Sequence, residues 1–119
     1  MSANKEEVKD VKGFMPRAVK YAQSVDSGFA NGISELYKSI WTDRENGLSM
    51  KQKHLITFSI ACSKNNTDSA KKILERLKKF NATRQEIEDV MMIATWTSGV
   101  QNFTDFSIVV LEEMDRLGF

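Results

Sequence analysis

Imidazole and thiol, two groups able to do chemistry, occur once each in this sequence and within a single apolar segment. His54 and Cys62 open and close the stretch HLITFSIAC at residues 54–62. An imidazole can donate or accept a proton near neutral pH, which suits it to general acid and base catalysis. A lone cysteine forms neither an internal disulfide nor a dithiol couple, and in an apolar run it packs like a small hydrophobic residue. We therefore predict that Cys62 belongs to the core and treat His54 as a candidate catalytic group.

Catalysis by a single histidine requires a partner that orients the ring and stabilises its charge. The sequence offers carboxylates at Asp68, Glu86, Glu88 and Asp105, which the fold would have to bring close to His54. The alternative is that His54 is a surface or half-buried helix residue without a chemical role. Neither interpretation requires a metal or a cofactor, and we predict none.

Length and composition favour one soluble domain over residues 1–119, because 41% hydrophobic and 28% charged residues suit a compact globular chain. The formal net charge of +1 gives no overall field that would attract nucleic acid or an anionic membrane. The opening residues MSANKEEVKDVKG carry charges where a signal peptide would be apolar. We expect a cytoplasmic protein that contacts neither nucleic acid nor membrane.

One segment is rich in cations, but a negative charge interrupts it at Glu75 and no aromatic side chains are interleaved with it. Binding of phosphate or nucleic acid would favour such aromatic platforms. We interpret the segment as the solvated face of a helix, whose cations are Lys71, Lys72, Arg76, Lys78 and Lys79.

Apolar residues recur every three or four positions along most of the chain, which predicts an all-α domain of about five to six helices. We predict that residues 1–14 form a loosely packed segment that includes a short charged helix at 4–11. We also expect Pro16 to lie at a helix start. The stretch 17–41 is one long helix or two short ones, since Gly28 and Gly32 allow a break near SGFANG.

Helix boundaries are better specified in the second part of the chain. Ser49 with Gln52, and Thr83 with Glu86, match the capping box at helix starts. These starts predict helices at 49–63 and 83–98, the first apolar on nearly every side and therefore central. Asn66 or Thr67 begins a helix between them, whose inward residues are Ala70, Ile73, Leu74 and Leu77. Gly99 ends the helix that begins at Thr83, and a last helix covers 102–117. The asparagines of three glycosylation sequons are interpreted as caps or surface residues near helix starts: Asn65, Asn81 and Asn102.

The order of these parts resembles the carboxymuconolactone decarboxylase family, which includes the AhpD-like alkylhydroperoxidases. The resemblance covers residues 40–115 and is carried by Leu48-Ser49, by ATRQEI at 82–87 and by the turn Ser98-Gly99-Val100. It implies an all-helical subunit that assembles into a homotrimer or homohexamer, with sites near subunit contacts. A late cluster of apolar residues agrees with self-association, because one small core cannot bury all of it. The cluster consists of Met91, Met92, Trp96, Phe103 and Phe106.

The resemblance also identifies the positions where relatives keep their chemistry. The peroxidase-like branch has a CxxC pair, a histidine and a glutamate where this chain has Asn66 and Ser69, Ile73, and His54. The sequence therefore argues against dithiol peroxide reduction. The decarboxylase branch keeps the histidine that Ile73 replaces, and it tends to carry another where this chain has Asp105.

Two functions remain open from the sequence. The first is a diverged, cofactor-free enzyme on a small organic acid or lactone, with His54, Ser69 and Asp105 as candidate catalytic residues. The second is a non-catalytic oligomer that keeps the scaffold and a pocket for a small organic ligand, lined by Asn66, Ile73 and Trp96. A pocket that joins His54 to a carboxylate would favour the enzyme. Hydrocarbon filling the site at Asn66, Ser69 and Ile73 would mean that the inherited activity is lost.

Overall fold

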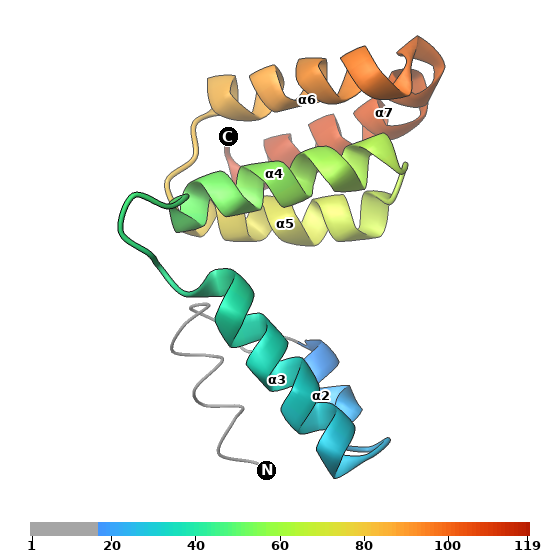
Figure 1. Ribbon diagram of the computed structural model, residues 1–119. Coiled ribbons are helices and arrows are strands. Elements are labelled where there is room, and N and C mark those ends of the chain that lie inside the picture. Colours follow the sequence, from blue (N-terminus) through green and yellow to red (C-terminus); the bar gives the residue numbers. More distant parts are fainter. Residues whose placement is uncertain (1–16) are drawn as a thin grey trace. The chain divides into compact units, whose positions relative to one another are not determined.

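The computed structural model describes residues 17–119, and these residues form six α-helices with no strand among them (Figure 1). This confirms the predicted all-α fold. The predictions of a short helix at 4–11, a loosely packed segment at 1–14 and a helix start at Pro16 lie outside the described residues. The chain divides into two compact units, Met1–Leu48 and Ser49–Phe119. The assignment of a single domain over 1–119 stays a prediction.

The described part of the first unit contains two helices, α2 (Arg17–Ala22) and α3 (Ser27–Trp41). The break between them lies just before the two glycines, because Asp26 starts α3 by accepting a hydrogen bond of 2.8 Å from the Phe29 amide. Gly28 and Gly32 lie inside α3. The stretch 17–41 is therefore two helices, and an N-cap rather than a glycine separates them.

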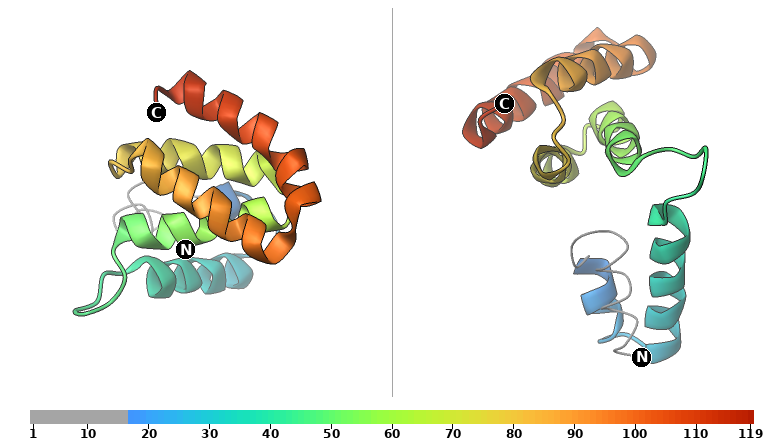
Figure 2. Two further views of the ribbon diagram at one scale, coloured as in Figure 1. Left: turned by 90° about the horizontal axis from the view of Figure 1, so that it is seen from above. Right: turned by 90° about the vertical axis from the view of Figure 1, so that its left-hand side faces the viewer.

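The second unit is a bundle of four helices, α4 (Met50–Ser63), α5 (Thr67–Lys79), α6 (Arg84–Ser98) and α7 (Val100–Leu117). Helix α4 packs against α5 and α6, and each of these in turn packs against α7 (Figure 2). The capping boxes at Ser49 and Thr83 are confirmed, and Asn66 is the residue that caps α5. The last helix begins two residues earlier than predicted because Gly99, at φ 96°, turns the chain directly from α6 into α7.

Two of the sequon asparagines, Asn65 and Asn81, are exposed and lie near helix starts, as predicted. Asn65 and Asn81 have positive φ angles of 52° and 60° and close the helices that precede them. The amide of Asn66 donates to the Ala61 carbonyl and that of Asn65 to the Cys62 carbonyl, which is the Schellman pattern at a helix C-terminus. Asparagine tolerates this left-handed backbone, so it replaces the usual glycine.

The core of the second unit is formed by inward residues of all four helices. The inward face predicted for α5 is confirmed, since Ala70, Ile73, Leu74 and Leu77 are all buried. Helix α4 is not enclosed on every side within the described chain, because Ile56 and Ile60 are exposed. The other large side chains of the core are Phe58, Ile87, Met91, Phe106, Val110 and Met114.

Candidate functional site

The positions that the resemblance assigns to the relatives' catalytic residues lie at the start of α5. In this chain, they cap the helix and pack in the core. The Asn66 side chain accepts a hydrogen bond of 3.2 Å from the Ser69 amide, which caps the helix. One turn further along, Ile73 is 9% exposed and belongs to the core cluster with Phe58 and Leu74. Hydrocarbon therefore occupies the position that the resemblance assigns to the relatives' histidine, and neither Asn66 nor Ile73 lines the grooves described below.

His54 is buried in α4, with 1% of its surface exposed. Its Nδ1 lies 2.9 Å from the Met50 carbonyl oxygen one turn earlier, and its ring packs against Phe80 with 5.0 Å between ring centroids. Neither of these two contacts is with a carboxylate. The structure thus places the single imidazole in the interior of the second unit, against a backbone oxygen and a benzene ring.

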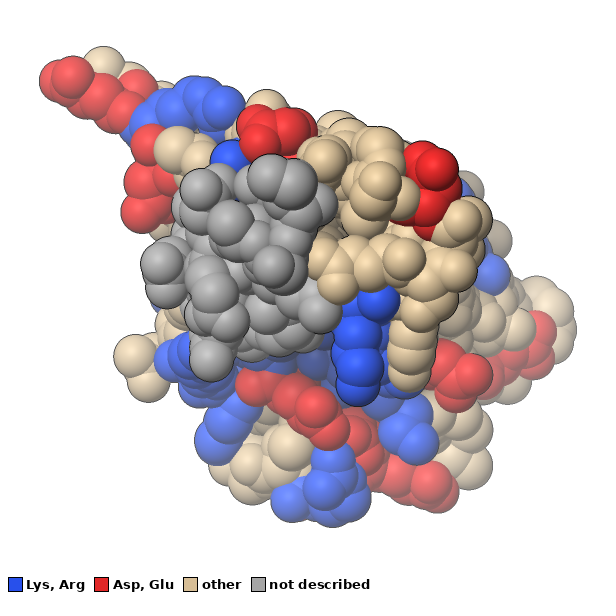
Figure 3. Space-filling view, turned by 90° about the horizontal axis from the view of Figure 1, so that it is seen from below, with Lys and Arg blue, Asp and Glu red and all other residues tan. Residues whose placement is uncertain are grey.

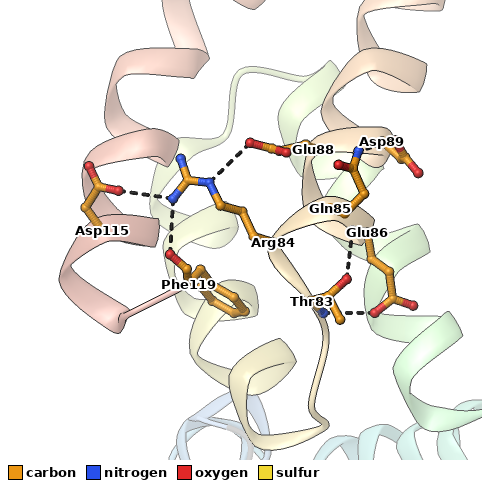
Figure 4. Close-up of polar contacts among 8 residues, drawn as sticks. All are labelled: Thr83, Arg84, Gln85, Glu86, Glu88, Asp89, Asp115 and Phe119. Carbon is orange, nitrogen blue, oxygen red and sulfur yellow. Dashed lines mark hydrogen bonds and ion pairs between the residues drawn. The ribbon is translucent and has the colours of Figure 1, made fainter.

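The candidate carboxylate partners of His54 are occupied elsewhere or exposed. Glu86 accepts a hydrogen bond of 2.9 Å from the Thr83 amide (Figure 4) and one of 3.2 Å from Lys51. These bonds lower the pKa of the Glu86 carboxyl group, and the bond from the Thr83 backbone has the largest effect. Glu88 accepts from Arg84 at 3.1 Å. Asp105 is exposed on α7 and has no hydrogen bond or ion pair with any residue in 17–119.

Cys62 behaves as the sequence predicts for a core residue. It is fully buried in α4, and this burial raises the pKa of its thiol to about 12. Thiolate is the reactive form of cysteine, so the thiol has almost no nucleophilic character near neutral pH. Within residues 17–119, no group of three or more His, Cys, Asp or Glu side chains could hold a metal ion.

Trp96 does not line an enclosed pocket, because it is 89% exposed on α6. It lies one turn beyond Ile93, which is 63% exposed and lines a shallow groove of about 230 Å³ between α4 and α6. Ile56 and Ile60 face the same groove from α4. We call the surface made of Ile56, Ile60, Ile93 and Trp96 the α4–α6 face.

The sequence analysis included Trp96 in an apolar cluster suited to self-association but did not identify Ile56, Ile60 or Ile93, although a signal was present. Helix α6 carries a second apolar stripe at Met92, Ile93 and Trp96, in addition to the inward stripe that begins at Ile87. A helix with two apolar stripes requires two partners, and the bundle formed by α4 to α7 supplies only the inner one.

Figure 3 shows basic and acidic side chains interspersed across one face of the described chain. In the groove between α5 and α7, Glu113 is only 6% exposed and accepts two hydrogen bonds, of 2.7 and 2.6 Å, from the Arg116 guanidinium. Arg116 also forms an ion pair of 3.4 Å with Glu75 of α5. This pair supports the interpretation that the charged face of α5 is solvated and that its charges pair with other side chains of the bundle.

Other long-range contacts hold the ends of the helices in place. Asn102 on α7 donates to the Cys62 carbonyl at 2.9 Å and to the Ser98 hydroxyl at 3.0 Å. No helix within 17–119 is long and apolar enough to cross a membrane. The contacts of Asn102 stabilise the bundle, and they place no reactive side chain in a cleft.

Comparison with known proteins adds one finding. No curated protein and no solved structure was found to match the chain. The model of the Carboxymuconolactone decarboxylase family matches residues 28–112, which run from α3 to near the end of α7. The match extends to α3, whereas the resemblance identified from the sequence covers residues 40–115. With most of its length covered and with the all-helical architecture described above, the chain belongs to the carboxymuconolactone decarboxylase family.

Proposed function

We propose that this protein is a non-catalytic member of its family that works as a self-associating helical scaffold. The observation that carries the proposal is the contrast between a filled inherited site and an uncovered α4–α6 face. Ile73 fills the core where relatives keep a histidine, whereas Ile93 and Trp96 place apolar surface in water. Exposed apolar patches of this kind are typical of surfaces that bind another protein.

The occupant of the α4–α6 face is a second copy of this chain. The groove is lined by Leu55, Ile56, Ile60, Val90, Ile93 and a single hydroxyl, that of Ser59. No charge in this lining would select a particular small ligand, and a neighbouring apolar helix would exclude water from all of it. Family membership leads us to propose a homotrimer or homohexamer.

The native mass of the full chain tests the proposal, measured by sedimentation velocity over a range of concentrations. A matched pair of variants makes the test specific, because Ile93 and Ile108 are 63% and 62% exposed but only Ile93 belongs to the α4–α6 face. Ile93→Glu places an unpaired carboxylate in the contact, at a cost of several kcal/mol. We expect a multimer for the unchanged chain and for Ile108→Glu, and a monomer for Ile93→Glu. A monomeric unchanged chain, or an unaffected Ile93→Glu variant, would contradict the proposal.

The alternative function is a diverged enzyme on a small organic acid or lactone that uses His54. The burial of His54 against Met50 and Phe80 speaks against it. Incubation of the full chain with carboxymuconolactone, followed for product by mass spectrometry, separates the two. We expect no turnover. Turnover that the His54→Ala variant loses would establish the enzyme and overturn the scaffold.

A further inference from the structure

A second groove lies on the other side of α6, between α6 and α7, and it differs in chemistry from the one on the α4–α6 face. It has a volume of about 290 Å³. Apolar side chains form most of its walls, but two polar side chains of α6 also line it. Its lining residues are Gln85, Glu88, Met91, Met92, Phe103 and Leu111.

The apolar walls combine one fixed ring with two adaptable side chains. The ring of Phe103 is held edge-on against Phe106, with 5.4 Å between centroids. Met91 is buried beneath the groove and Met92 is exposed beside it. Thioether side chains are flexible and polarisable, and they make favourable contacts with aromatic rings. The groove therefore suits a small aromatic or branched aliphatic group.

The polar end of the groove has more negative than positive charge. Arg84 is shared, since its Nε donates to Glu88 at 3.1 Å and its Nη1 to Asp115 at 3.2 Å and to the Phe119 carbonyl at 3.1 Å (Figure 4). Next to them, Asp89 accepts from the neutral Gln85 amide at 3.0 Å and has no ion pair with a described residue. Glu88 and Asp115 thus share the one guanidinium of Arg84, and Glu88 is the only ionisable side chain in the lining of the groove, so a ligand with a positive charge would give Glu88 a further partner.

We propose that the α6–α7 groove binds a small amphipathic organic cation. Its apolar group lies between Met92 and Phe103, and its ammonium group lies beside Glu88. The pairing of an apolar slot with a single acidic side chain, Glu88, favours a cation over an anion or a neutral molecule of the same shape. The groove of the α4–α6 face has no ionisable residue in its lining and would not make this distinction.

The experiment uses the full chain with methyl-labelled methionine and two probes of similar shape and opposite charge, 2-phenylethylammonium and 3-phenylpropanoate. Binding is followed from the methyl resonances of Met91 and Met92, which are assigned with Met→Leu variants. We expect millimolar phenylethylammonium to shift both resonances and phenylpropanoate to shift neither. Added salt should weaken the binding, since the charges are close to the surface.

Variants make the assignment specific. Glu88→Gln removes the carboxylate beside the ammonium and should weaken binding about fivefold, the effect of one partly exposed charge. Leu111→Lys should abolish binding while it leaves the Arg84 contacts in place. Glu45→Gln, an equal change of charge in the exposed loop after α3, should have no effect. Equal shifts with both probes, no shifts at Met91 and Met92, or unchanged binding by Leu111→Lys would each overturn the proposal.

Discussion

The interior of the second unit around Ile73 and the α4–α6 face contain the same kind of side chain in opposite settings. In the interior, Ile73 stands at the position that the resemblance assigns to a histidine of relatives, and it belongs to the core cluster with Phe58 and Leu74. On the α4–α6 face, Ile93 and Trp96 are in water. In the interior, an apolar residue packs in the core where a catalytic residue is expected in relatives. On the α4–α6 face, apolar residues form an exposed surface that favours binding to a partner.

The pair Ile73→Ala and Ile93→Ala sharpens this comparison most and has the largest expected effect. The Ile73 substitution leaves a cavity in a packed core and should lower the free energy of unfolding by about 2 to 5 kcal/mol. The Ile93 substitution should change it by less than about 0.5 kcal/mol in the dissociated chain. Denaturant unfolding of both variants at low protein concentration measures the difference. Equal losses at the two positions would show that the two settings are not distinct.

Asn102→Ala tests whether the interior depends on a polar contact at the end of α4. The amide of Asn102 satisfies the carbonyl of Cys62. Its removal takes away one hydrogen bond to this carbonyl, to which the Asn65 amide also donates, and should cost about 0.5 to 1.5 kcal/mol of stability. The neighbouring exposed Gln101→Ala variant is the control and should change stability by less than about 0.5 kcal/mol. Thermal unfolding of the two variants compares them, and an unaffected Asn102→Ala variant would contradict the structural role of this amide.

Much of this arrangement was predictable because it depends on local patterns. Ser49 and Thr83 begin their helices through capping boxes that lie within four residues, so the sequence contains the whole interaction. Burial of Cys62 followed from the apolar run around it. The contacts of Arg84 with Asp115 and Phe119 join residues more than 30 positions apart, and no local pattern encodes such pairs.

The functional predictions were hardest where burial had to be known in advance. His54 is a polar residue in an apolar helix, and the amino-acid sequence alone did not decide whether it belongs to a catalytic site or to the core. Trp96, near the Ser98-Gly99 turn, was a candidate to line a ligand pocket, and it is 89% exposed. The exposure of a tryptophan depends on which helix faces remain uncovered after folding, which is a property of the whole bundle.

The smallest expected effect concerns the charge of Glu113 on α7. The guanidinium of Arg116 lowers the pKa of the buried Glu113 carboxyl group, with a further contribution from Lys71. A lowered folded-state pKa adds stability above the unfolded value of about 4.3, and this stability is lost as the pH falls through the folded value. Unfolding measured between neutral pH and acid should show a smaller loss of stability for Glu113→Gln than for the unchanged chain. An identical pH dependence would show that this ion pair does not contribute.

Labelling of the folded protein tests the central claim most directly, because His54 and Cys62 are the only histidine and cysteine in the sequence. The full chain is treated with diethylpyrocarbonate and, separately, with a maleimide, and the products are counted by mass spectrometry with and without denaturant. The account predicts that both side chains stay unmodified in the folded protein and react quickly once it is unfolded. Rapid modification of either one in the folded protein would contradict the account, since it would show that a reactive group is open to small molecules.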